Sequence, residues 1–138
     1  MSSNNKSVQP RKQRLERYSA PLHKKQKYVH VHLTKDLRQK YGFRNVQVRK
    51  GDKVKLLRGQ FKNKEDVVER VDLKKEKVFV KGVELIKKDG TKSSYPLNPS
   101  NLMITNLDLS DKKRKAKLNS KSDNKVENKD KKDNQKSE

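Results

Sequence analysis

Apolar residues between positions 48 and 82 recur in three short runs that are separated by polar turns. The runs occupy residues 54–57, 67–71 and 78–80. Their spacing of two, their β-branched side chains and the turn-forming residues on either side predict strands and not helices. A sheet of three short strands has to close on itself or find further partners, because its edges would otherwise be exposed. The pattern therefore predicts a mainly β fold organised around a miniature barrel.

The segments on both sides of these runs predict further elements. Residues 34–42 predict the clearest helix, with Thr34 as its N-cap and Gly42 as its C-terminal stop. Large apolar residues at every fourth position give this helix a face that docks on the barrel and leave basic side chains on the other face. An Asp-Gly pair at 89–90 predicts a hairpin turn. Residues 102–104 predict the closing strand after a turn rich in Pro and Asn.

The composition limits how much of the chain can fold by itself. The chain has 138 residues, of which 28% are hydrophobic and 40% are charged. This is too little apolar material for a core that uses the whole length. We expect a basic N-terminal extension with short helices (1–43), a β-barrel (44–110) and a disordered Lys-rich tail (111–138). No apolar segment has the length of a signal sequence or a membrane span, so we expect a cytosolic, soluble protein without membrane insertion.

The distribution of charge indicates a polyanionic partner. The net charge is +21. Residues 1–50 contain 14 basic and 2 acidic side chains, whereas residues 51–110 contain 13 and 9, and residues 111–138 contain 11 and 6. A nearly balanced centre with strongly basic arms is typical of a module that binds nucleic acid. An anionic membrane surface is the second candidate, but no basic amphipathic helix with a broad apolar face supports it.

The N-terminal region leaves two structural alternatives open. Residues 1–20 are predicted to be disordered in isolation. Residues 19–27 predict either a short basic helix with Pro21 in its first turn or a charged linker, and neither is favoured. His30 and His32 alternate with apolar residues in an extended run. Since the sequence supplies no further ligands nearby, a strand or RNA contact is favoured over a metal site.

The loop at residues 58–66 combines cations with one aromatic residue. Gly59, Asn63 and Asp66 tolerate a left-handed backbone, so the loop can bring N–H groups and lysine side chains close to phosphates. Phe61 would offer its face to a base. The alternative, favoured for the loop considered alone, is a solvated turn in which Phe61 folds back under the barrel.

The sequence contains seventeen candidate RNA-binding residues. Most are Lys or Arg, whose side chains contact phosphates, while Phe61 and His23 can stack on bases. They are Arg11, Lys12, Arg14, Arg17, His23, Lys24, Lys25, Lys27, Arg38, Arg44, Arg49, Lys50, Arg58, Phe61, Lys62, Asn63 and Lys64.

Catalytic chemistry is not predicted. The sequence has no Cys, which excludes disulfides and Cys-ligated zinc. It also lacks a Ser/His/acid grouping, a Gly-rich phosphate loop and a cluster of metal ligands. We therefore expect neither an enzyme nor a cofactor.

Several runs, taken together, resemble a known family. Residues 49–52 (RKGD), 58–62 (RGQFK) and 98–104 (NPSNLMI) are similar to a KOW module. With the flanking runs 20–23, 33–38 and 108–111, the chain resembles the archaeal and eukaryotic branch of the universal large-subunit ribosomal protein family numbered twenty-four. The likeness covers roughly residues 11–115.

The resemblance implies a Src-homology-three-like barrel in a ribosome-associated, cytoplasmic protein. It further implies binding to the 5′ region of large-subunit rRNA, a role early in subunit assembly and a position near the peptide exit tunnel. Neighbouring large-subunit proteins are the expected protein partners, and no homo-oligomer is expected. Asn63 and Asp66 depart from the family's usual glycines. An acidic side chain at Asp66 would repel phosphate, for which Lys64 would compensate.

One alternative function shares the same module. KOW modules also occur in transcription elongation factors, where they contact RNA polymerase and nascent RNA. Such a factor is expected to carry a separate folded domain before the module, and the first 45 residues are too short and too polar to form one.

Overall fold

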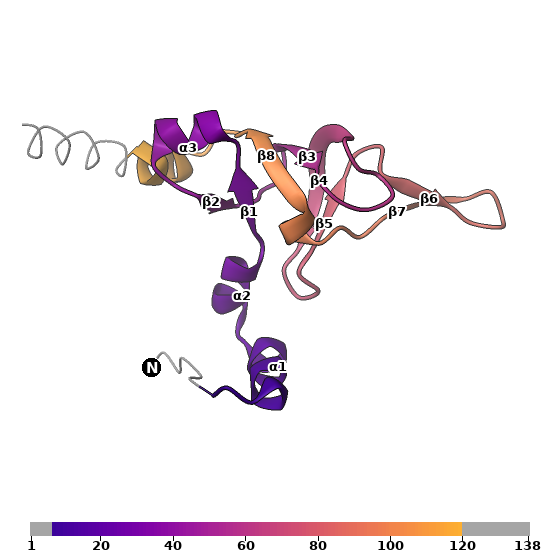
Figure 1. Cartoon of the computed structure of the whole chain (residues 1–138). Coiled ribbons are helices and arrows are strands. Elements are labelled where there is room, and N and C mark those ends of the chain that lie inside the picture. Colours follow the sequence, from indigo (N-terminus) through magenta and orange to yellow (C-terminus); the bar gives the residue numbers. More distant parts are fainter. Residues whose placement is uncertain (1–6, 120–138) are drawn as a thin grey trace, which may run out of the picture.

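The computed structural model describes residues 7–119, which combine an open β-sheet with short helices (Figure 1). The elements in chain order are α1 (Pro10–Ser19), α2 (Leu22–Tyr28), β1 (His30–Leu33), α3 (Lys35–Tyr41), β2 (Asn45–Gln47), β3 (Lys53–Leu56), β4 (Glu65–Asp72), β5 (Lys77–Val80), β6 (Glu84–Ile86), β7 (Lys92–Ser94), the 3-10 turn η1 (Pro99–Asn101) and β8 (Leu102–Asn106). Residues 112–119 form a further helix, called here the C-terminal helix. The three predicted central strands are confirmed as β3, β4 and β5.

Six strands form one sheet in the order β2-β1-β8-β3-β4-β5. β1 and β8 are parallel, with His32 opposite Met103, and the other neighbouring pairs are antiparallel. β8 therefore lies at the centre of the sheet and joins the first strand of the chain to the three central strands. The predicted Asp-Gly hairpin is confirmed as the separate pair β6 and β7, in which the N–H of Lys87 donates to Thr91 O at 2.9 Å.

The core is built from alternate residues of these strands. Val54 and Leu56 in β3, and Leu102 and Ile104 in β8, are fully buried, as are Val31 and Leu33 in β1. A spacing of two places each pair on one face of its strand, so the alternation seen in the sequence becomes a single apolar layer. α3 covers part of this layer with Tyr41, which is buried, and Leu37, which packs against the core.

The predicted closed barrel is wrong, because the end strands β2 and β5 do not pair with each other. The β4–β5 register shifts between Val68 and Arg70, and a bulge of this kind increases the local strand twist. Both edges are protected in other ways. On β5, Val78 and Leu97 exchange two backbone hydrogen bonds of 2.9 Å. On β2, the Gln47 carbonyl accepts a hydrogen bond from Arg114. The fold is accordingly mixed helix and sheet, with no need for closure to protect the edges.

The helix predicted at residues 34–42 is confirmed as α3. α3 ends as predicted at Gly42, whose φ of 68° is left-handed and whose N–H donates to Arg38 O at 2.9 Å. Thr34 occupies the N-cap position, but its side chain makes no capping hydrogen bond. The basic segment after Pro21 is a helix and not a linker, with Pro21 at the N-cap and not in the first turn.

Two segments that composition predicts to be disordered are helical. Residues 10–19 form α1, although none of its side chains is buried. Residues 112–119 are helical as well, and bury Arg114 and Leu118, so the prediction of a disordered tail from residue 111 is wrong for residues 111–119. The rest of the predicted tail, 120–138, and residues 1–6 of the N-terminal extension lie outside the described residues.

Candidate nucleic-acid interface

The helices α1 and α2 form a basic arm that extends away from the sheet (Figure 1). It carries eight of the predicted contacts, namely Arg11, Lys12, Arg14, Arg17, His23, Lys24, Lys25 and Lys27. All are exposed except Lys24 and Lys25, which are half-buried. Cations on a projecting helix are accessible to the phosphates of a nucleic acid from several directions.

Arg17 has a different role in this arm from the other cations. Its guanidinium forms a short ion pair with Glu76, in the turn between β4 and β5, and lies 5.3 Å from the centre of the Tyr28 ring. The hydrogen bond that Arg17 donates to Glu76 raises the pKa of Arg17, against the opposing effect of desolvation. Lys25 Nζ adds a long hydrogen bond of 3.5 Å to Lys74 O in the same turn. Arg17 is therefore an anchor that fixes the arm to the sheet.

The loop between β3 and β4 has the backbone that its residues predict at two of three positions. Gly59 and Asn63 have positive φ values of 98° and 68°, whereas Asp66 lies within β4 and has no positive φ. The N–H of Asn63 donates to Leu56 O at 2.8 Å, which closes the loop. Lys64 Nζ makes a short hydrogen bond to Gly82 O. Arg58 and Lys62 are exposed, so the surface of this loop is basic.

Phe61 adopts the folded-back alternative. Its ring is half-buried against the core and packs on Tyr95, with the ring centres 5.5 Å apart and the planes at 57°. Tilted aromatic pairs of this kind stabilise the packing of a loop. A stacking contact between Phe61 and a base stays a prediction that this geometry does not support.

The remaining predicted cations are spread over the sheet edge near β2. Arg44 and Lys50 are exposed. Arg38 is half-buried and its Nε donates to Leu33 O at 2.8 Å, so it helps to hold α3 on β1. Arg49 forms a short ion pair with Asp111, and this contact lowers the pKa of the Asp111 carboxyl group. The structure thus brings Arg49 next to the C-terminal helix.

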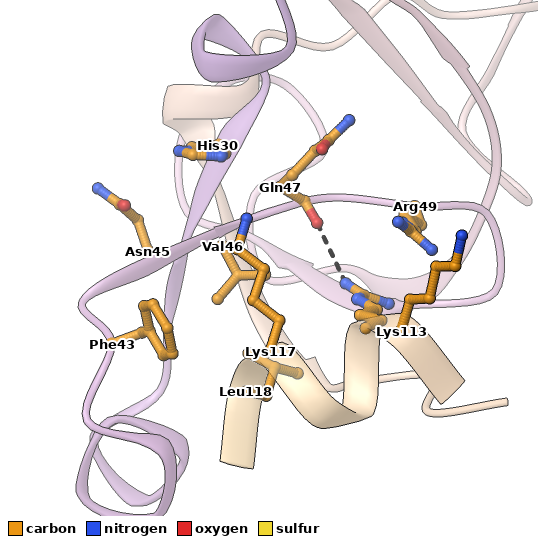
Figure 2. Close-up of a pocket in the computed structure, with 10 residues that line it drawn as sticks. His30, Phe43, Asn45, Val46, Gln47, Arg49, Lys113, Lys117 and Leu118 are labelled. Atoms are coloured by element: carbon orange, nitrogen blue, oxygen red, sulfur yellow. Dashed lines mark hydrogen bonds between the residues drawn. The ribbon is translucent and has the colours of Figure 1, made fainter. Parts of the chain in front are cut away.

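A buried charge network holds the C-terminal helix and was missed by sequence reasoning (Figure 2). Arg114 donates to both carboxylate oxygens of Asp52, at 2.6 and 2.7 Å. It also donates to Asp108 O at 2.9 Å and to Gln47 O at 3.1 Å. Asp52 is fully buried and Arg114 is 6% exposed. Such a bidentate pair satisfies both charges only while the helix stays docked.

Asp52 is further bound by main-chain groups. It accepts hydrogen bonds from the N–H of Arg49 at 2.8 Å and of Asp108 at 3.0 Å. One available signal for the helix was Asp111, whose side chain accepts from the N–H of Lys113 at 2.9 Å, as an N-cap residue does. A second was the spacing of four between Arg114 and Leu118. Neither signal led to a helix prediction, because the many lysines around these residues are typical of a disordered tail.

Within residues 7–119, no group of three His, Asp or Glu side chains is placed to hold a metal ion. No helix in this part of the chain is long and apolar enough to cross a membrane.

A basic arm and a basic loop on a small sheet are typical of the class of proteins that bind a polyanion. The chain belongs to the family of ribosomal proteins described as L26 in eukaryotes and as the L24 type in archaea, whose model matches residues 7–121. It is 47% identical over 115 residues to the large ribosomal subunit protein uL24 of Methanosphaera stadtmanae, which covers 83% of this chain and 98% of the relative. It is 50% identical over 112 residues to the protein of the same name from Methanocorpusculum labreanum, covering 81% and 93%.

Membership of this family confirms three predictions. The suspected family is the right one, and its archaeal and eukaryotic branch is the matching one. The relatives are structural ribosomal proteins, so the chain is not an enzyme. A protein of this family is associated with ribosomes in the cytoplasm.

Proposed function

We propose that the chain is a structural constituent of the large ribosomal subunit that binds large-subunit rRNA. The observation that carries this proposal is the basic arm, which projects from the sheet and exposes Arg11, Lys12 and Arg14 on α1. Its cations would contact phosphates of neighbouring RNA helices, and specificity would come mainly from RNA shape. The sheet would serve as a rigid base for the arm and for the loop at residues 58–64.

The more detailed placement is also a proposal. The 5′ region of the rRNA, a role early in subunit assembly and a position near the peptide exit tunnel are supported by the resemblance of residues 49–62 and 98–104 to the family's motif. Neighbouring large-subunit proteins would complete the environment, and the chain would act as a single copy. Crosslinking of the assembled subunit, followed by mapping of the crosslinked nucleotides, tests the 5′ placement. Crosslinks confined to the 3′ half would contradict it.

A transcription elongation factor is not favoured, because both relatives are ribosomal proteins. Sedimentation of a native lysate at low and high salt separates these functions. We expect the chain to travel with the large subunit and to remain there after a high-salt wash. Sedimentation with RNA polymerase, or at the top of the gradient, would refute the ribosomal function.

The arm is expected to supply more of the rRNA affinity than the sheet does. We would compare two triple variants of equal charge change, Arg11→Gln/Arg14→Gln/Lys27→Gln in the arm and Lys87→Gln/Lys88→Gln/Lys92→Gln in the β6–β7 hairpin. All six side chains are exposed. Loss of three phosphate contacts reduces the slope of log affinity against log salt by roughly 2–3. We expect that reduction for the arm variant and a smaller one for the hairpin variant.

Removing residues 1–27 gives the strongest form of this test. The deletion ends before Val29, which is fully buried, and so leaves the core intact. An rRNA affinity at physiological salt equal to that of the full chain would show that the arm is not the main contact.

A further inference from the structure

A groove of about 390 Å³ lies between β2, the beginning of β1 and the C-terminal helix (Figure 2). Its volume is near the lower end of the range typical of small-ligand sites. One wall comes from residues 113–118, which dock there through the Arg114–Asp52 pair. The groove therefore depends on the tertiary contact that composition alone did not reveal.

Apolar, amide and basic side chains line this groove. Phe43 and its apolar neighbours Val46 and Leu118 form an apolar surface. Asn45 and Gln47, at the two ends of β2, also line the groove, with their amide ends on the side of β2 away from Phe43 and the C-terminal helix (Figure 2). The C-terminal helix contributes the ammonium groups of Lys113 and Lys117, and β1 contributes His30 from the opposite side. An anion alone would need only the cations, whereas the apolar surface fits an uncharged ring.

Burial and neighbouring charges both lower the pKa of His30, which favours the neutral ring. Desolvation lowers the pKa of His30, and the ammonium groups of Lys117 and Lys27 lower it further. Arg49, which is paired with Asp111, lines the same groove as His30. A neutral imidazole offers one hydrogen-bond donor and one acceptor. The groove thus combines positive charge from lysines with neutral polar groups from the sheet.

We propose that this groove binds one unstacked nucleotide of an RNA strand. The base would lie on Phe43, and its phosphate would lie beside Lys113 and Lys117. Proteins that recognise single-stranded RNA use this combination, because a base removed from its stack offers both a flat face and free hydrogen-bonding edges. The proposal rests on the proposed function, since the nucleotide belongs to the RNA that the chain binds.

The direct test is an NMR titration of the full-length chain with adenosine 5′-monophosphate and, separately, with inorganic phosphate. With the nucleotide we expect shifts of the backbone amides at residues 43–47 and 113–118. With phosphate at the same concentration we expect smaller shifts, confined to residues 113–117. Equal shifts with both ligands, or none at residues 43–47 with the nucleotide, would overturn the proposal.

Two variants measure the contacts separately. Phe43→Leu keeps an apolar side chain but removes the stacking face, and should raise the nucleotide Kd roughly tenfold. Lys113→Gln changes an exposed side chain and should raise the Kd about threefold through loss of a phosphate contact. Lys88→Gln/Lys92→Gln, in the distant hairpin, is the control and should leave the Kd unchanged. The same spectra report whether each variant is folded, and an unchanged Kd in folded Lys113→Gln and Phe43→Leu would refute the site.

Filter binding of full-length chain to purified large-subunit rRNA separates this proposal from the function on which it rests. Tight rRNA binding without a nucleotide response at residues 43–47 would overturn the groove and leave the rRNA-binding function standing. A nucleotide response without rRNA binding would overturn the rRNA-binding function and, with it, the assignment of the groove to RNA.

Discussion

The protein has two basic arms, the N-terminal one formed by α1 and α2 and the C-terminal one formed by the C-terminal helix. α1 and the C-terminal helix have similar compositions but are held in different ways. Residues 10–19 contain four basic residues and one acidic residue, and residues 112–119 contain five basic residues and no acidic residue. α1 buries none of its side chains and is tied to the sheet by the pair of Arg17, which is exposed, and Glu76, whose side chain is 13% exposed. The C-terminal helix buries Arg114 against Asp52 and Leu118 against the core.

The comparison shows that charge content does not decide whether a basic segment is ordered. Separating a buried, bidentate ion pair costs much free energy because each charge is left buried without its partner. In a solvent-exposed pair, water can replace the partner at little cost. We therefore expect α1 to move easily when a new partner competes for Arg17, and the C-terminal helix to stay in place. For an RNA-binding protein, this would make the N-terminal arm the adaptable one.

Replacing Arg114 should have the largest effect. Arg114→Ala leaves the buried Asp52 carboxylate without its partner, and we expect a loss of about 3–5 kcal/mol in the free energy of unfolding. Urea denaturation measures this loss. Lys115→Ala, an exposed position on the same helix, is the control and should change stability by less than about 0.5 kcal/mol. A loss below about 1 kcal/mol for Arg114→Ala would mean that the two arms are held alike.

Removing Leu118 should have the next largest effect. Leu118 is 3% exposed and packs at the end of the described helix. Leu118→Ala should cost about 2 kcal/mol, the lower end for buried leucine because the site is near the surface. Amide hydrogen exchange should show faster exchange at residues 112–119 than in the unmodified chain. Unchanged protection there would show that Arg114 alone holds the helix.

Breaking the Arg17–Glu76 pair should have a small effect on stability. Exposed ion pairs contribute about 0.2–1 kcal/mol, so Arg17→Ala should lower the unfolding free energy by about 0.5 kcal/mol. The expected structural effect is faster amide exchange in α1 with no change in β4 and β5. If Arg17→Ala instead destabilised the sheet by more than about 2 kcal/mol, α1 would be as firmly integrated as the C-terminal helix.

A pH effect at His30 should be the smallest and reports on both arms, because Lys27 and Lys117 come from different ones. The pKa of His30 is lower in the folded state than its ordinary value of about 6.5. The folded state therefore binds fewer protons, so stability is fully present above about pH 6.5 and decreases as the pH falls below it. An NMR titration of the His30 ring, with His30→Gln as the control for the pH dependence of unfolding, checks this. A His30 pKa at or above its ordinary value would contradict it.

The position of the site was only partly predictable. The alternation at Val54, Leu56, Val78 and Val80 directly implies strands with one buried face, because side chains on a strand alternate between its faces. Gly42 predicted the end of α3, since a left-handed residue stops a helix. The partner of Asp52 could not be predicted, because Arg114 is 62 positions further along the chain and stands among lysines.

The family, the central strands, the hairpin and the basic character of both arms could be predicted from the sequence alone. These depend on local spacing and on residue types, which act over a few positions. Three features could be seen only in the three-dimensional structure. The sheet stays open, Phe61 packs on Tyr95, and residues 112–119 form one wall of a groove with β2. Each of these depends on contacts between residues far apart in the sequence. A charge or a ring leaves water there only because a distant residue pairs with it or packs against it.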